Sequence, residues 1–193
     1  ERYISGNRCE KPLGLGKDKE LPDMYRYKLD QIREVSEQCA ADAAVHKRHR
    51  GGIGLPLGLN MYENLFFWVA FFHSLDFDLV ISDISSRQLY AKGQYSVPSD
   101  TACYPAKLMH GHIENLLDKG VDTIFYPCMS YNFNEEKGDN HFNCPVVAYY
   151  PELLASNVEK LKNIRYLYPY LNLAERKTFP KKVWEALHEQ YPD

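Results

Sequence analysis

Apolar and polar positions alternate along this chain in blocks whose spacing predicts strands and helices in turn. Short apolar runs bounded by glycine, proline or polar residues predict strands; they lie at residues 53–59, 78–82, 122–126, 146–149 and 163–168. Apolar residues three or four positions apart predict helices; these cover residues 25–45, 61–75, 85–91, 105–120 and 151–161, with a last helix after residue 180. The predicted fold is therefore α/β, with a mostly parallel sheet of four to five strands and helices on both faces.

The helix predicted over residues 61–75 is apolar on almost every side. Asn60 precedes it and Glu63 follows three positions later, which is the pattern of a capping box. A helix at the surface carries a polar face. We therefore expect this helix to be covered on more than one side, either at the centre of the domain or against a part of a longer protein.

The first fifty residues differ in character from the rest. Residues 1–23 are rich in Gly, Lys and Pro and show no apolar period, and the first predicted helix follows them. We therefore expect an N-terminal arm and a connecting helix in residues 1–50, and the α/β domain in residues 51–193. Because the sequence starts at Glu1 with neither an initiator Met nor a signal segment, we expect a piece of a longer protein.

Composition narrows the classes of partner. The chain has 193 residues, 45% of them hydrophobic, which suits one sizeable α/β core. The net charge is −3, and the one basic cluster, residues 46–50, is typical of a solvated helix end, so no nucleic-acid partner is expected. The longest apolar run, residues 65–72, is too short to span a membrane. Five cysteines without dense spacing fit a reducing, cytoplasmic location.

Two cysteines lie where parallel α/β folds place their chemistry. Cys103 comes two residues before Pro105, at a helix start, where the helix dipole favours a thiolate. Cys128 follows the strand predicted at residues 122–126. Because both positions fall on one edge of the sheet, we expect a shared site: a reversible disulfide, or part of the ligand set of a soft metal or an iron–sulfur cluster. The alternative is two cysteines that only fill the core.

Cys144 is harder to place. It precedes the strand predicted at residues 146–149, and a parallel strand there would start at the opposite edge of the sheet. Cys144 would then lie about 15 Å from Cys128, given about 3.3 Å per residue along a strand. It joins the site only if residues 129–143 return to the same edge and make that strand antiparallel.

Two further polar motifs, a histidine pair and a Ser-Ser-Arg segment, each have a structural interpretation as well as a functional one. His110 and His112 lack the i, i+4 spacing of two metal ligands on one helix turn, so we expect both to be packed or to lie at the solvent edge, with the glycine between them allowing a close helix contact. Ser85, Ser86 and Arg87 precede a short helix. They either cap that helix or hold an anionic group of CoA or a nucleotide.

Several short motifs are similar to those of one family, the uncharacterised domain of CoA-substrate-specific enzyme activases, related to 2-hydroxyglutaryl-CoA dehydratase activators. The resemblance is dense over residues 51–152. The motifs that carry it are Leu59-Asn60-Met61-Tyr62-Glu63-Asn64, Phe67-Trp68, Ser85-Ser86-Arg87, Cys103-Tyr104-Pro105-Ala106-Lys107, His110-Gly111-His112 and Phe125-Tyr126-Pro127-Cys128. The chain departs from the family pattern at Leu57, where a basic residue is expected, and at Ser130-Tyr131-Asn132, where Pro-Tyr-Glu is expected.

The resemblance implies a three-layer Rossmann-like domain similar to the subunits of 2-hydroxyacyl-CoA dehydratases, which hold a 4Fe–4S cluster through cysteines. By that analogy Cys103, Cys128 and Cys144 are the candidate ligands. The implied function is an accessory redox domain that supports ATP-driven electron transfer to an acyl-CoA dehydratase in anaerobic metabolism, with that dehydratase or other domains of the same chain as partner.

No activity of its own is expected from this piece, because the ATPase of such an activase would lie elsewhere in a longer protein. The alternative is a non-catalytic docking domain, or a CoA- or nucleotide-binding domain, whose cysteines are structural.

Overall fold

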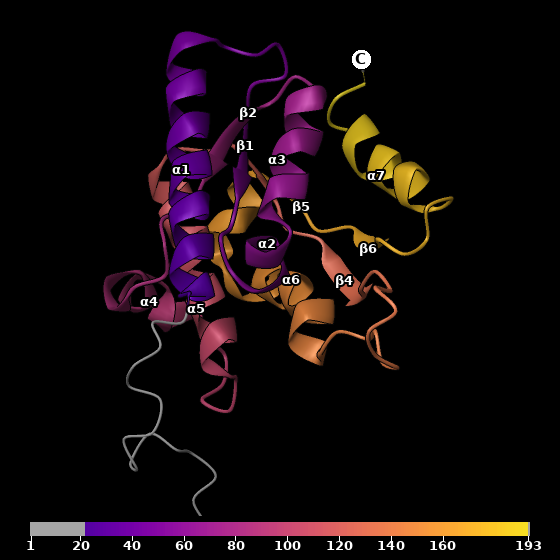
Figure 1. Ribbon diagram of the computed structural model, residues 1–193. Helices are drawn as coiled ribbons and strands as arrows, with labels where there is room; N and C mark the ends of the chain where they lie inside the picture. Colours follow the sequence, from indigo (N-terminus) through magenta and orange to yellow (C-terminus); the bar gives the residue numbers. More distant parts are fainter. Residues whose placement is uncertain (1–21, 193) are drawn as a thin grey trace, which may run out of the picture. The chain divides into compact units, whose positions relative to one another are not determined.

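The computed structural model describes residues 22–192 and is built around a sheet of four parallel strands in the order β2-β1-β3-β5 (Figure 1). The strands are β1 (Gly52–Leu55), β2 (Asp78–Ile81), β3 (Thr123–Phe125) and β5 (Arg165–Leu167). Pro56 ends β1 directly after Leu55, since proline supplies no N–H to a ladder. The predicted α/β class and the parallel sheet are confirmed.

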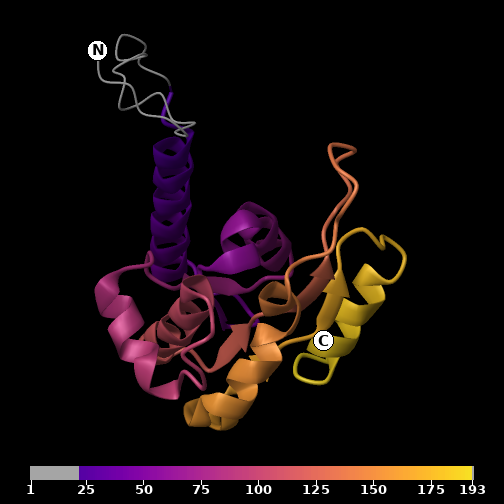
Figure 2. The same ribbon diagram turned by 90° about the horizontal axis from the view of Figure 1, so that it is seen from below.

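Helices cover both faces of this sheet (Figure 2). The helices are α1 (Met24–Val45), α2 (Leu59–Glu63), α3 (Leu65–Ser74), α4 (Arg87–Gly93), α5 (Tyr104–Asp118), α6 (Pro145–Asn157) and α7 (Phe179–His188), with short 3-10 turns η2 (Gln94–Ser96) and η3 (Glu159–Asn163). From β1 the chain moves outward to β2, and from β2 it crosses back past β1 to β3. Right-handed crossovers in opposite directions place α3 on one face and α5 and α6 on the other.

A second, two-stranded sheet continues from the first. It joins β4 (Cys128–Tyr131) to β6 (Tyr170–Asn172) in parallel. Each strand follows its neighbour in the main sheet after only two residues, so β4 extends the path of β3 and β6 that of β5. Neither strand is apolar enough along its length to be predicted from periodicity.

The apolar helix predicted over residues 61–75 is two helices, α2 and α3, with Asn64 between them. The residue that starts α2 is Gly58, in extended conformation, and its carbonyl accepts from the N–H of Met61. The prediction that Asn60 caps this helix is therefore wrong, because the chain already turns into the helix before that residue.

The core is aromatic on the α3 face of the sheet. Trp68 and Phe72 each place their ring centroids 4.9 Å from that of Phe125 in β3. On another side of α3, Phe67 and Phe71 contact the ring of Phe179 in α7, at 6.0 and 6.4 Å. Phe66 and Phe67 nevertheless remain 43% and 41% exposed, so the expectation that this helix is covered on more than one side is met only in part.

The chain divides into two compact units at Arg33, within α1, and the sheet belongs to the unit that begins at Glu34. The helix predicted over residues 25–45 is α1, within one residue. Within the described part of the chain, no helix combines the length and apolar character needed to cross a membrane.

Candidate functional site

The carboxyl edge of the sheet carries Cys103 at the start of a helix. Cys103 is the residue before α5, with φ −63° and ψ 155°, and Pro105 lies in the first turn. Its side chain is exposed and does not cap the helix. Because α5 runs from the end of β2 toward the start of β3, its first turn lies at the carboxyl edge, as the sequence predicts.

Cys128 lies at the same edge but is buried. It is the first residue of β4, and its backbone N–H donates to the carbonyl of Pro169 at 2.9 Å. Burial raises the pKa of the Cys128 thiol to about 11, while hydrogen bonds from the backbone of Glu152 and the hydroxyl of Tyr170 act in the opposite direction. Cys128 is therefore a neutral thiol at neutral pH, and a metal would have to displace its proton.

Cys144 is at this edge too, which corrects the sequence prediction. Residues 146–149 are not a strand but the first turns of α6, and Cys144 is the residue before that helix, with φ −63° and ψ 157°. Valine and tyrosine favour strands, but Pro145 suits a helix start, and tertiary packing overrides such a weak preference. Since α6 leads into β5, its first turn faces the carboxyl edge rather than the opposite one.

The loop before Cys144 is fastened to the strand that begins with Cys128. The side-chain amide of Asn143 donates to the carbonyl of Met129 at 2.8 Å, and its backbone N–H donates to the carbonyl of Ser130 at 3.0 Å. Residues 129–143 therefore return to the same edge. They do so through a hydrogen-bonded loop that ends in a helix. The sequence analysis had required an antiparallel strand at residues 146–149 for Cys144 to reach this edge.

Two tyrosine hydroxyls lie among the three cysteines. The Tyr150 hydroxyl pairs with Nε2 of His110 at 2.9 Å, and burial, with the nearby charge of Cys103, raises the pKa of Tyr150 to about 12. The Tyr126 hydroxyl is fully buried and has no hydrogen-bond partner among the described residues. Burial raises the pKa of Tyr126 well above the usual value. The nearby charges of Cys128, Tyr150 and Cys144 raise it further, in that order of size.

An open cleft of about 650 Å³ adjoins this group. One wall is the segment just before Cys103, including Pro98 and Ala102, and the other is formed by residues along the length of α6, from Pro145 to Asn157. Tyr150 lines the cleft as well. The two exposed cysteines therefore adjoin a cavity of the size that small molecules or partner groups occupy.

The donor chemistry of the edge fits a thiolate-bound metal group, but the ligand set is not assembled. In residues 22–192, no group of three or more His, Cys, Asp or Glu side chains is arranged to hold a metal ion. Cysteine sulfur is the ligand that iron–sulfur clusters use, and the partnerless Tyr126 hydroxyl is a hydrogen-bond donor that a bound group would satisfy. The cysteines of this region are unbridged thiols.

Ser85, Ser86 and Arg87 lie at the carboxyl end of β2. Ser86 caps α4, accepting from the N–H of Leu89 at 3.1 Å, and Ser85 pairs with Nε2 of His112 at 2.9 Å. Arg87 is exposed. Ser85 also lines a cavity of about 260 Å³, which has room for only part of a CoA or nucleotide molecule. Both serines thus have structural partners, and an anion at these residues stays a prediction.

His110 and His112 are packed residues, the first of the two positions that the sequence left open. Both are fully buried, and each ring nitrogen has a partner: Ser96 and Tyr150 for His110, and Ser82 and Ser85 for His112. Burial lowers the pKa of each to about 4, so both are neutral at pH 7. Neither has a nitrogen to spare for a metal.

The sequence analysis missed Tyr126 and Tyr150. Tyr126 could have been noticed, because it lies at the carboxyl end of a buried strand two residues before a candidate cysteine. Tyr150 had no such signal, because its partner His110 is forty residues away in sequence and on another helix.

A parallel sheet with helices on both faces, and with its candidate site residues at the carboxyl edge, defines a Rossmann-like α/β domain. The profile of the CoA enzyme activase uncharacterised domain matches residues 52–191, and the chain belongs to this family. The predicted family is thereby confirmed. No curated protein and no solved structure matches the chain.

Proposed function

We propose that this domain is the redox accessory domain of a CoA enzyme activase, with an iron–sulfur cluster held at the carboxyl edge by Cys103, Cys128 and Cys144. The observation that carries the proposal is the delivery of three thiols to one edge by three separate elements, α5, β4 and α6. Family membership supports an activase-related role. The proposed partner is a CoA-dependent enzyme of the acyl-CoA dehydratase class, and the proposed location is the cytoplasm.

The three cysteines have different parts in this proposal. Cys103 and Cys144 are exposed beside an open cleft, where a cluster could be loaded and could face a partner. Each lies directly before a helix with proline in its first turn. Cys128 gives the site a buried anchor, and the Tyr126 hydroxyl gives it a hydrogen-bond donor.

A bound cluster would supply one-electron transfer at low potential. The electron would come from a reduced iron–sulfur carrier and pass to the CoA-dependent enzyme, with ATP hydrolysis by another part of the activase as the driving reaction. The residues of this domain would bind the cluster, exclude water on the Cys128 side and leave the cleft side open to the partner.

The test is anaerobic reconstitution with iron and sulfide. We expect the wild-type chain to gain charge-transfer absorption, and Cys103→Ala, Cys128→Ala and Cys144→Ala each to reduce the bound iron. Cys39→Ala is the matched control, because Cys39 is a buried thiol that lies away from the carboxyl edge. It is in α1 near Arg48, and Arg48 precedes β1 and so lies toward the amino edge of the sheet.

Cys9 lies outside the described residues, so Cys9→Ala is made in parallel to ask whether it contributes a fourth ligand. The proposal fails if wild type binds no iron, or if the three alanine variants at the edge bind as much iron as Cys39→Ala.

A further inference from the structure

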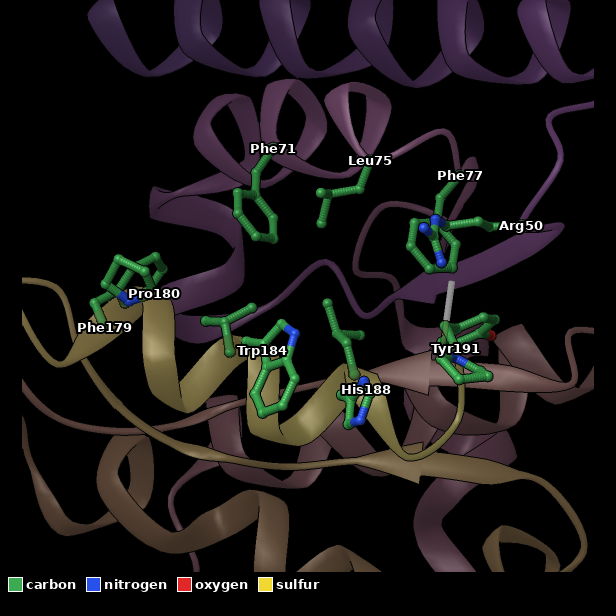
Figure 3. Close-up of a pocket in the computed structure, with 12 residues that line it drawn as sticks. Arg50, Phe71, Leu75, Phe77, Phe179, Pro180, Trp184, His188 and Tyr191 are labelled. Carbon is green, nitrogen blue, oxygen red and sulfur yellow. The ribbon is translucent and has the colours of Figure 1, made fainter.

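A second cavity, of about 370 Å³, lies between α3 and α7, away from the cysteines (Figure 3). Phe71 and Leu75 point into it from α3, while Trp184 and His188 line it from α7. Trp184 is 59% exposed, so the cavity reaches the solvent beside this residue. The cavity therefore has a wall on each helix and an entrance at α7.

Aromatic contacts close the two ends of this cavity. At one end the rings of Phe71 and Phe179 lie 6.4 Å apart, and at the other those of Phe77 and Tyr191 lie 4.8 Å apart, edge to face. Between these contacts the lining is aliphatic and aromatic, and it remains open. Protein interiors contain few spaces larger than a water molecule, so an apolar space of this size between two helices is suited to a ligand.

The polar side chains along the cavity are already engaged, which favours a neutral ligand. Arg50 has an interaction within the chain, and the Tyr191 hydroxyl pairs with that of Thr123 at 2.8 Å. The His188 ring stacks on Trp184, with the two centroids 4.2 Å apart. The described residues of the lining include neither Asp nor Glu. A charged group that entered would lose its hydration without a free opposite charge to replace it, and such burial is costly.

Size and lining together favour an aromatic ligand. A cavity of about 150 Å³ accommodates benzene, and pockets for small molecules start at about 300 Å³. At about 370 Å³ the space suits a body of two fused rings and is too small for a whole nucleotide cofactor. Aromatic pairs favour offset or edge-to-face geometry with centroids about 4.5–7 Å apart. Because Phe71 and Trp184 line opposite walls, a ring between them would gain such contacts on both sides, which a saturated body could not.

We propose that the cavity between α3 and α7 is a binding site for a small neutral aromatic compound, with its rings between Phe71 and Trp184. The site is separate from the cysteine edge, so the proposal stands or falls without the redox proposal. A bound compound would contact both helices and so hold α7 against α3.

The test compares three probes of similar ring size by titration calorimetry of the whole chain at pH 7. The probes are 2-naphthol, which is neutral and aromatic, 2-naphthoate, which is charged, and decahydro-2-naphthol, which is neutral and saturated. We expect saturable binding of 2-naphthol. Binding of 2-naphthoate should be about tenfold weaker or more, because its charge is buried without a free partner. Binding of decahydro-2-naphthol should be about two- to tenfold weaker, because it lacks the aromatic contacts.

Two variants locate the bound probe. Leu75→Trp fills the cavity from within and should abolish binding of 2-naphthol, whereas Phe66→Leu, at an exposed position of α3 outside the lining, should leave it unchanged. Circular dichroism and thermal unfolding establish that each variant folds. Should Leu75→Trp fail to fold, Trp184→Leu decides: its side chain is largely exposed, so the chain should fold without it, and loss of this ring should weaken binding about tenfold.

The proposal predicts an order of affinities as well as a location. The absence of saturable 2-naphthol binding overturns it, as does a 2-naphthoate affinity equal to or higher than that of 2-naphthol. Equal affinity for decahydro-2-naphthol would show that the site does not select an aromatic body. Unchanged 2-naphthol binding in folded Leu75→Trp, or in Trp184→Leu, would place the probe elsewhere on the chain and so refute the assignment.

Discussion

Cys103 and Cys144 adopt almost the same backbone conformation, each as the residue before a helix with proline in its first turn. Their φ and ψ angles are −63° and 155°, and −63° and 157°. Neither sulfur caps its own helix, and both side chains are exposed. Two helices from different crossovers therefore present thiols in the same way at the same edge, while Cys128 is buried beside them.

Thiol reactivity should follow this division. We expect Cys103 and Cys144 to react rapidly with iodoacetamide in the native, metal-free domain, because they are accessible and lie at helix N-termini. Cys128 and Cys39 should stay unmodified until the domain unfolds, because both are buried and burial raises the pKa of each to about 11. Mass spectrometry of digested, pulse-labelled protein measures each site separately. Labelling of Cys128 at the rate of Cys103 would show that this edge opens readily.

Removal of the side-chain hydroxyl should have opposite effects on stability at Tyr126 and at Tyr150. Tyr126→Phe removes a buried hydroxyl that has no partner, so the metal-free domain should keep its stability or gain up to ~1 kcal/mol. Tyr150→Phe leaves Nε2 of His110 unpaired in the core, which should cost about 1–3 kcal/mol. Urea unfolding of the two variants measures both effects with the same chemical change. Equal losses would mean that the Tyr126 hydroxyl is already satisfied in the metal-free state.

The stability of the folded domain should decrease as the pH is lowered through the range set by His110 and His112. The unfolded chain binds protons on these rings near the ordinary pKa of 6.5, whereas the folded state does so only near 4. Between these values unfolding takes up protons, so the stability present above pH 6.5 is lost progressively toward pH 4. The difference between a pKa of 6.5 in the unfolded chain and about 4 in the folded state corresponds to roughly 3 kcal/mol of stability at most for each ring.

Urea unfolding between about pH 4.5 and 7 measures this dependence. His112→Gln should make the slope shallower, since it removes one of the two titrating rings. An unchanged slope in that variant would assign the acid sensitivity to other groups.

Gly111 should tolerate no side chain. A Cβ at Gly111 would lie 2.1 Å from the carbonyl oxygen of Leu89, where α4 and α5 pack backbone to backbone. Gly111→Ala should therefore cost more than about 3 kcal/mol or prevent folding. Gly138→Ala is the control, because nothing lies within 4 Å of the added Cβ, and its effect should stay within about 0.5 kcal/mol. Thermal unfolding of both proteins, compared with wild type, measures the difference.

Much of the fold follows from local pattern. The strands of the main sheet and the helix from Tyr104 lie where apolar runs and Pro105 predict them, because those signals are consecutive in sequence. The errors fall where two local signals compete. Val146 to Tyr149 has the composition of a strand, yet the segment is helical because Pro145 starts a helix that packs against β4.

The candidate site was predicted in part. Cys103 and Cys128 could be placed because each adjoins an element whose end is evident from sequence. Cys144 could not, because its position depends on the hydrogen bonds of Asn143 to Met129 and Ser130, which no spacing rule encodes. The burial of the Tyr126 hydroxyl likewise depends on neighbours from several elements.

The sequence by itself determined the α/β class, the family and the presence of two thiols at one edge, because periodicity, helix starts and short motifs are properties of neighbouring residues. The tertiary structure decided that Cys144 joins that edge, that His110 and His112 are neutral and fully paired, and that an apolar cavity with Arg50 at one end lies between α3 and α7. Those features are set by contacts between segments far apart in the chain. Their geometry exists only once the elements have packed.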